Sequence, residues 1–276
     1  KIRSLTFKGM KNLVLGAGLI GTHLADALVA RGEDVRVLSR GTGHDLKRAE
    51  NYVDDFAWAD RVWFVAWDTG VRKAEAPAEY EMGILGSNND LCQSVFRVLK
   101  DTKKPFLFVS SQAALSPDIF VLGVTKRIGE MWTRLLGGYT ARFWNVYGWE
   151  PVGEKSHLVP DLVWKGMKDG VVSLMSSGEE TRQFLHVQDA AQALIHQFDS
   201  GQKVADITSG EWIPVKVVAE RIGVLIGAQV MLGAAAGKSS LALPQTPLAG
   251  WRPRLTLDEG LSEVIVQAKQ WKPDTR

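Results

Sequence analysis

A strand, a glycine-rich loop and a helix follow one another near the start of this chain and constrain its fold most strongly. The loop Gly16–Gly21 reads GAGLIG and lies between the apolar run Asn12–Leu15 and a helical pattern over Ile20–Arg31. Gly32 ends that pattern, and Asp34–Leu38 has the composition of a second buried strand. Two strands joined through a helix at this spacing predict a parallel βαβ unit.

The loop itself has the pattern G-x-G-x-x-G. In that pattern Gly16 permits the tight turn, Gly18 lets a pyrophosphate approach the backbone, and Gly21 allows the helix to pack against the strand. The free N–H groups of Leu19 and Ile20, at the start of the helix, are expected to bind phosphate. The loop therefore predicts a nicotinamide dinucleotide site, and the alternative is a vestigial glycine turn.

The end of the second strand discriminates between the two nicotinamide coenzymes. A carboxylate there would bond the ribose 2′-hydroxyl of NAD, whereas an arginine suits the 2′-phosphate of NADP. The sequence has Ser39 and Arg40 at this place and no carboxylate before Asp45. We therefore expect NADP, with NAD as the alternative, unless Arg40 is only a solvated loop cation.

Strands and helices alternate through most of the chain. This alternation predicts an α/β fold of Rossmann type, in which helices cover both faces of a parallel sheet. The further apolar runs are 61–66, 105–110, 139–144 and 204–208, and the helical patterns are 80–99, 124–135, 190–198 and 258–268.

Composition excludes several classes of protein. A net charge of +2 without a basic cluster argues against nucleic-acid binding. The only cysteine, Cys92, and the absence of an apolar run of about 20 residues predict a cytoplasmic protein without membrane contact. The five histidines are scattered, so no metal site is expected. Residues 1–9 precede Met10, and we expect them to be a remnant outside the folded domain.

Several short segments of the chain are distinctive when taken together. They are GAGLIGTHL (16–24), FVSS (108–111), GVTKRIGE (123–130), NVYG (145–148), SHLVP (156–160), TRQFLHVQD (181–189) and GWRP (250–253). In this order they resemble the extended short-chain dehydrogenases, in particular the nucleotide-sugar epimerases, dehydratases and reductases. The resemblance runs from about Lys11 to Lys272.

This resemblance implies a Rossmann core and a smaller substrate-binding lobe. The core would comprise residues 10–147, with 186–226 returning to it, and the lobe would comprise 148–185 and 227–272. It also implies a nucleotide-linked sugar as the small-molecule partner and a homodimer formed through the helices 80–99 and 124–135.

The family's catalytic positions are poorly kept. Its members use a tyrosine four residues before a lysine, because positions i and i+4 share a helix face and the lysine lowers the tyrosine pKa. Lys126 matches the lysine, but Leu122 stands where the tyrosine is expected. Gln112 corresponds to the catalytic serine or threonine, and Gly83 to a helix asparagine. Lys126 and Gln112 remain the candidate catalytic residues.

The resemblance also assigns binding residues. For the cofactor these are Ala66, Trp67 and Ser110 at strand ends, Lys126 on the nicotinamide ribose, and Asp45 on the adenine; Trp67 replaces a small residue. For the substrate they are Asn145, His157 and the phosphate-binding Arg182. The alternatives are a loop-bonding Asn145, a structural donor at His157, an ion pair at Arg182 and a surface lysine at 126.

Two functions follow. The first is an NADP-dependent enzyme that modifies a nucleotide-linked sugar through hydride transfer, with a substitute for the missing tyrosine. The second is a catalytically silent NAD(P)-binding sensor or partner subunit, which the loss of three catalytic positions favours.

Overall fold

The computed structural model describes residues 9–70, 77–115, 120–153, 156–237, 239 and 242–272. The residues divide into two compact units. Unit 1 comprises residues 1–143, 191–206 and 246–249, and unit 2 comprises 144–190, 207–245 and 250–276. Residues 1–8, which belong to the segment expected to be a remnant, lie outside the described residues.

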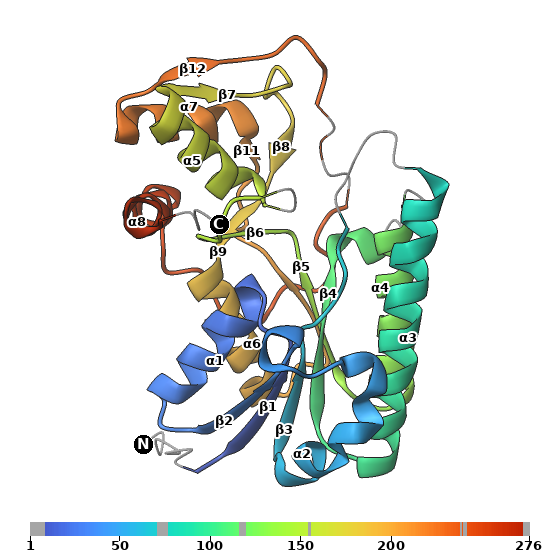
Figure 1. Ribbon diagram of the computed structural model, residues 1–276. Helices are drawn as coiled ribbons and strands as arrows, with labels where there is room; N and C mark the ends of the chain where they lie inside the picture. Colours follow the sequence, from blue (N-terminus) through green and yellow to red (C-terminus); the bar gives the residue numbers. More distant parts are fainter. Residues whose placement is uncertain are drawn as a thin grey trace. The chain divides into compact units, whose positions relative to one another are not determined.

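Unit 1 is built on a six-stranded sheet with the order β10-β5-β4-β3-β1-β2 (Figure 1). The βαβ unit expected around the glycine loop is confirmed, because β1 pairs in parallel with β2 in the register Leu15↔Leu38. The pairs β1–β3, β3–β4 and β4–β5 are also parallel. The strands are β1 (Lys11–Leu15), β2 (Asp34–Leu38), β3 (Arg61–Phe64), β4 (Phe106–Ser111), β5 (Tyr139–Phe143) and β10 (Val204–Ile207).

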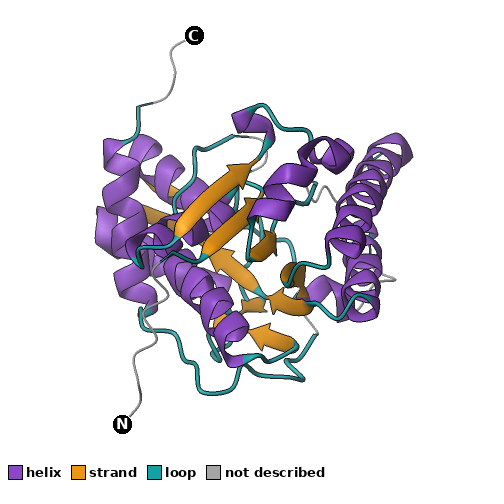
Figure 2. Cartoon of the chain, turned by 90° about the horizontal axis from the view of Figure 1, so that it is seen from below, coloured by secondary structure: helices purple, strands orange, loops and turns teal. Residues whose placement is uncertain are grey.

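Helices cover both faces of this sheet, as Figures 1 and 2 show. Adjacent strand residues point to opposite faces, so Trp63 packs against Phe198 of α6 while Phe64 packs against Phe96 of α3. The helices of this unit are α1 (Leu19–Ala30), α2 (Val53–Trp58), α3 (Ala78–Thr102), α4 (Val121–Leu135) and α6 (Val187–Ser200), with the short 3-10 turns η1 (Arg40–Thr42), η2 (Leu46–Tyr52) and η3 (Gln112–Leu115).

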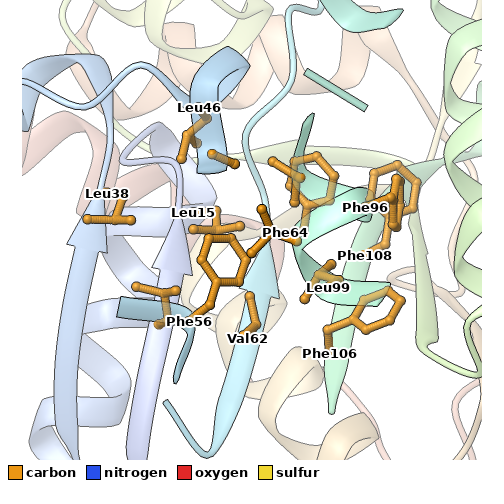
Figure 3. Close-up of a cluster of buried hydrophobic side chains, with 14 of the residues drawn as sticks. Leu15, Leu38, Leu46, Phe56, Val62, Phe64, Phe96, Leu99, Phe106 and Phe108 are labelled. Carbon is orange, nitrogen blue, oxygen red and sulfur yellow. The ribbon is translucent and has the colours of Figure 1, made fainter. Parts of the chain in front are cut away.

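The core on the α3 face is rich in aromatic rings (Figure 3). Phe64, Phe96 and Phe108 are fully buried, and their ring centroids lie 5.4–5.9 Å apart. Tilted and edge-to-face rings at this spacing add stabilisation beyond the burial of their area. This core fixes the ends of β3 and β4, from which several candidate site residues extend.

Unit 2 consists of helices and three short strand pairs. Strands β6 (Asn145–Tyr147) and β9 (Phe184–His186) pair in parallel, as do β7 (Val171–Ser173) and β12 (Gln229–Met231), while β8 (Thr181–Arg182) and β11 (Ile213–Pro214) are antiparallel. Its helices are α5 (Leu158–Asp169), α7 (Val215–Ile226) and α8 (Leu257–Gln270).

The boundary between the units differs from the expected one. Residues 207–226 were expected in the Rossmann core, but they lie in unit 2. The reason is α7, whose apolar face (Val218, Ala219 and Ile222) is fully buried in the core that α5 and α8 share. Helical periodicity indicates that a face is buried without indicating which core buries it.

Candidate functional site

The first and third glycines of the loop allow backbone segments to touch. Gly16 has φ = 110°, and a Cβ added to it would lie 2.7 Å from the Cα of Ala66. A Cβ on Gly21 would lie 2.0 Å from the carbonyl oxygen of Gly16. Gly16 also donates its N–H to the carbonyl of Leu38 at 2.9 Å. The loop is therefore held where the ends of β1, β2 and β3 meet.

Gly18 has a different environment. It is the N-cap residue of α1, no side chain caps the helix there, and nothing lies within 4 Å of a Cβ added to it. Gly18 is exposed, while Leu19 and Ile20 of the first turn are half-buried. The N–H groups of a helix start carry a partial positive charge and favour anions. The open side of Gly18 thus fits a pyrophosphate.

Ser39 and Arg40 follow β2 but differ in their availability to a ligand. The Ser39 hydroxyl and Thr42 form a capping box around η1, in which the N–H of Thr42 donates to Ser39 Oγ at 3.3 Å. Ser39 is buried by this turn. Arg40 is exposed, and no described residue forms an ion pair or a side-chain hydrogen bond with it. Arg40 is therefore available to bind a 2′-phosphate, whereas Ser39 shapes the turn.

Asp45, the expected adenine contact, caps η2. Its Oδ1 accepts the N–H of Lys47 at 3.1 Å, and its own N–H donates to the hydroxyl of Tyr52 at 3.0 Å. Asp45 is exposed, so its second carboxylate oxygen is open to solvent. An adenine contact at Asp45 remains a proposal.

The expected cofactor residues at the ends of β3 and β4 lie in different surroundings. Ala66 is half-buried and donates its N–H to the carbonyl of Leu15 at 2.7 Å. Ser110 is buried and donates its hydroxyl to Glu130 Oε1 at 2.6 Å. Gln112 is half-buried at the start of η3. Ser110 thus belongs to a buried polar network, and a cofactor contact at Ser110 remains a proposal.

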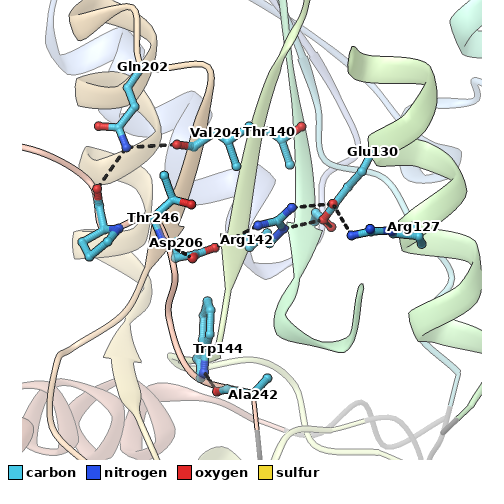
Figure 4. Close-up of polar contacts among 12 residues, drawn as sticks. Arg127, Glu130, Thr140, Arg142, Trp144, Gln202, Val204, Asp206, Ala242 and Thr246 are labelled. Carbon is cyan, nitrogen blue, oxygen red and sulfur yellow. Dashed lines mark hydrogen bonds and ion pairs between the residues drawn. The ribbon is translucent and has the colours of Figure 1, made fainter. Parts of the chain in front are cut away.

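That network joins β4, α4, β5 and β10 of unit 1 (Figure 4). Glu130 on α4 accepts two hydrogen bonds from the Arg142 guanidinium on β5, at 2.7 and 2.8 Å. Arg142 also contacts Asp206 Oδ1 at 3.4 Å, and Asp206 Oδ2 accepts the N–H of Thr246 at 2.7 Å. The hydrogen bonding of the Arg142 guanidinium to Glu130 is the main cause that raises the pKa of Arg142. A bidentate guanidinium–carboxylate pair of this kind fixes both side chains.

Lys126 is a buried lysine and not a surface one. Its residue is 4% exposed, and Nζ donates to the carbonyl oxygen of Val109 at 2.7 Å. Nζ also lies 4.4 Å from the centroid of the Trp67 ring and 5.0 Å from that of Phe108. Burial lowers the pKa of Lys126 to about 7, against the opposing influence of Glu130 and Cys92.

A polar clamp holds the loop after β3, and sequence reasoning missed it. Asn88 of α3 is fully buried; its amide donates to the carbonyl of Asp68 and its oxygen accepts the N–H of Asp68, both at 2.9 Å. Thr125 of α4 accepts the indole N–H of Trp67 at 3.3 Å. An asparagine inside the apolar stripe of α3 is the signal that could have indicated this clamp.

The expected substrate residues all belong to unit 2. Asn145 is half-buried, and its Oδ1 is a buried atom without a hydrogen-bond partner among the described residues. Arg182 is half-buried in β8. His157 lies before α5, and its Nδ1 is 2.6 Å from Glu150 Oε1. The hydrogen bond to Glu150 raises the pKa of His157.

No group of three or more His, Cys, Asp or Glu side chains in the described part of the chain is placed to hold a metal ion. Within the same residues, no helix combines the length and apolarity that a membrane crossing requires.

Comparisons with known proteins identify the relatives of this chain. Residues 123–207 match the NAD dependent epimerase/dehydratase family. Over 304 residues the chain is 23% identical to GDP-L-fucose synthase 1 of Arabidopsis thaliana, covering 95% of this chain and 94% of that protein.

Solved structures of epimerase type share the fold. UDP-glucuronic acid 4-epimerase from Bacillus cereus, in complex with UDP-glucuronic acid and NAD, has a TM-score of 0.78 at 20% identity, over 95% of this chain and 99% of that chain. GDP-D-glycero-L-gluco-heptose synthase from Campylobacter jejuni, in the presence of NADPH, has a TM-score of 0.76 at 16% identity, over 96% and 99%. The expected Rossmann-type α/β fold is therefore confirmed.

Proposed function

We propose that this chain binds NADP and uses it to modify a nucleotide-linked sugar. The observation that carries the proposal is the open N-terminus of α1 at Gly18, with the exposed guanidinium of Arg40 after the neighbouring strand. The loop N–H groups would bind the pyrophosphate, and Arg40 would bind the 2′-phosphate. Structures of this fold have been solved with NAD and with NADPH, so the choice of NADP rests on Arg40.

Nucleotide-sugar chemistry is proposed from the relatives and from three residues of unit 2. Arg182 would bind the diphosphate, because a guanidinium forms paired hydrogen bonds with phosphate oxygens. The unpartnered Oδ1 of Asn145 would accept a hydrogen bond from the ligand. His157, held by Glu150, would donate to a sugar hydroxyl or a phosphate.

A bound nicotinamide would supply or accept hydride, which epimerisation, reduction and dehydration of a sugar all require. The chain must move the accompanying proton without a tyrosine at position 122. Leu122 has no ionisable group, and Gln112 can only orient the reacting hydroxyl. Proton transfer would therefore use water or another side chain, and we expect turnover to be slow.

A second function is a catalytically silent NADP-binding sensor or partner subunit. The observation that favours it is the environment of Lys126, whose amine is buried and hydrogen-bonded to Val109. With Leu122 four residues earlier, α4 also lacks the tyrosine that the resemblance leads us to expect.

One experiment separates the two functions. The purified chain is incubated with NADP or NADPH and with UDP-, GDP- and dTDP-linked sugars, and products are sought by mass spectrometry. The enzyme proposal expects a new sugar mass or an exchanged sugar hydrogen with at least one donor. Binding of NADP without any product over the panel would instead establish the silent function.

A homodimer is proposed from exposed apolar side chains on α3 and α4. These two helices pack on each other in unit 1. These side chains are 36–69% exposed and comprise Met82, Leu85, Val124, Ile128, Met131 and Leu135. A second copy of the same two helices would cover them as a four-helix contact. The resemblance to dimeric family members supports this proposal.

A further inference from the structure

The topology of unit 1 determines where each half of a dinucleotide would lie. The pyrophosphate would lie at the start of α1, and the 2′-phosphate would lie beyond β2, at Arg40. Since β1 lies between β2 and β3, the nicotinamide half must extend the other way, across the ends of β3 and β4. The first residues after β3 are Val65, Ala66 and Trp67, and Ala66 touches the loop at Gly16.

Trp67 is fixed in this path by contacts on several sides. Its indole N–H donates to Thr125 Oγ1 at 3.3 Å, and its ring packs edge-on against Phe108 with centroids 5.2 Å apart. The next residue, Asp68, is held through its backbone by Asn88. A side chain with this many partners loses packing and hydrogen bonds if it moves.

Trp67 also closes the space above Lys126. The ammonium has Val109 as its hydrogen-bond acceptor and two aromatic faces, Trp67 and Phe108, within 5.0 Å. Cation–π contacts of a desolvated ammonium are substantially stabilising. The amine thus has one hydrogen-bond acceptor and two ring contacts within the protein, and only 4% of the residue is exposed.

We propose that Trp67 takes the place of the nicotinamide ribose on Lys126, so that the nicotinamide half of the coenzyme lies against the indole and makes no contact with the lysine. Trp67 is then the residue that determines how this half is bound, and Lys126 is a structural residue. The inference rests on the proposed binding of NADP and holds for both the enzyme and the silent protein.

The test compares two ligands by titration calorimetry. NADP carries the nicotinamide riboside, and adenosine 2′-phosphate 5′-diphosphate lacks it while keeping the adenosine, the 2′-phosphate and two phosphates at the 5′ end. Because the riboside would meet the indole and not the ammonium, removal of the ammonium should leave the ratio of the two dissociation constants unchanged. A direct hydrogen bond to an ammonium would separate them by about tenfold or more.

Lys126→Met is the first variant, because methionine fills the space without a donor. We expect it to bind NADP within about twofold of the unaltered chain. If the lysine instead binds the ribose, Lys126→Met should weaken the binding of NADP by about tenfold and leave the affinity for the shorter ligand unchanged. That result would overturn the inference.

Trp67→Ala is the second variant, and it should expose the ammonium. The ratio of the two dissociation constants should then shift by about fivefold or more in favour of NADP, compared with the unaltered chain. The double variant Trp67→Ala, Lys126→Met should not show this shift. An unchanged ratio in Trp67→Ala overturns the inference. Should Trp67→Ala not fold, Trp67→Leu keeps the apolar packing, removes the aromatic face and gives the same readout.

The control for the proposed function is the shorter ligand itself. If neither ligand binds the unaltered chain, the proposed NADP site is wrong and the inference fails with it. If both bind but NADP binds more tightly through Lys126, only the inference fails.

Discussion

At the scale of single residues, the three loop glycines have three different reasons to lack a side chain. Gly16 needs both a positive φ and contact with Ala66, Gly21 needs contact with the Gly16 carbonyl, and Gly18 needs neither. A side chain at Gly16 or Gly21 would disturb the fold, whereas one at Gly18 would meet only a ligand. Structural and ligand-binding glycines of one motif are therefore separable by mutation.

Arg40→Ala should lower the affinity for NADP and leave the affinity for NAD unchanged. Loss of a charge-assisted contact to the 2′-phosphate should weaken NADP about tenfold to a hundredfold. Arg48→Ala is a matched control, since Arg48 is also exposed in the following turn. The measurement is titration of both coenzymes into each variant, and an equal loss for NAD and NADP would contradict the assignment.

The sequence indicates some features of the candidate site and leaves out the contacts between distant residues. The glycine pattern and the position of Arg40 after a strand can be recognised in the sequence, because both depend on local order along the chain. The burial of Lys126 cannot be predicted in this way, because it depends on Trp67 and Phe108, which are distant in sequence. Likewise, the partner of Ser110 is Glu130, 20 residues away on α4. Contacts between elements are not encoded in spacing alone.

At the scale of elements, strands and helices were predicted more reliably than their ends. The run 61–66 was expected as one strand, but β3 ends at Phe64. Val65 and Ala66 leave the strand because both donate their N–H groups to the carbonyl of Leu15. This bend brings Ala66 against the glycine loop and Trp67 over Lys126, so the end of one short strand shapes the candidate cofactor site.

The helix pair α3–α4 carries the prediction about assembly. Met131→Asp places a charge among exposed apolar side chains, and a buried unpaired charge would disfavour a dimer. We expect the mass from light scattering to fall from about twice to once the chain mass of 30.4 kDa. Val29→Asp on α1 alters a side chain of similar exposure, 59% against 56%, and should leave the mass unchanged. A monomeric unaltered chain would refute the dimer.

At the scale of the whole molecule, the buried lysine links stability to pH. The pKa of Lys126 is about 7 in the fold and 10.5 as a free side chain, with burial as the main cause and Glu130 and Cys92 opposing it. Between these values the unfolded chain binds the proton and the folded chain does not. The Lys126 contribution to the free energy of unfolding therefore rises with pH in this window, by at most about 1.4 kcal/mol per pH unit.

Urea unfolding at pH 7 and pH 9.5 tests this linkage. The unaltered chain should gain stability relative to Lys126→Met between the two values, because methionine removes the titrating group. If the free energy of unfolding changes equally in the two proteins between pH 7 and pH 9.5, burial does not lower the pKa of Lys126.

The proposed binding of NADP depends on phosphate binding at the start of α1, and Gly18→Ala tests it most directly. Gly18 has φ = −80°, and no atom lies within 4 Å of a Cβ added to it. The free energy of unfolding of the variant should therefore lie within about 1 kcal/mol of that of the unaltered chain. The same methyl group would occupy the space of the pyrophosphate, and calorimetry should show NADP affinity reduced about tenfold or more. Undiminished NADP binding by a folded Gly18→Ala variant would contradict the account.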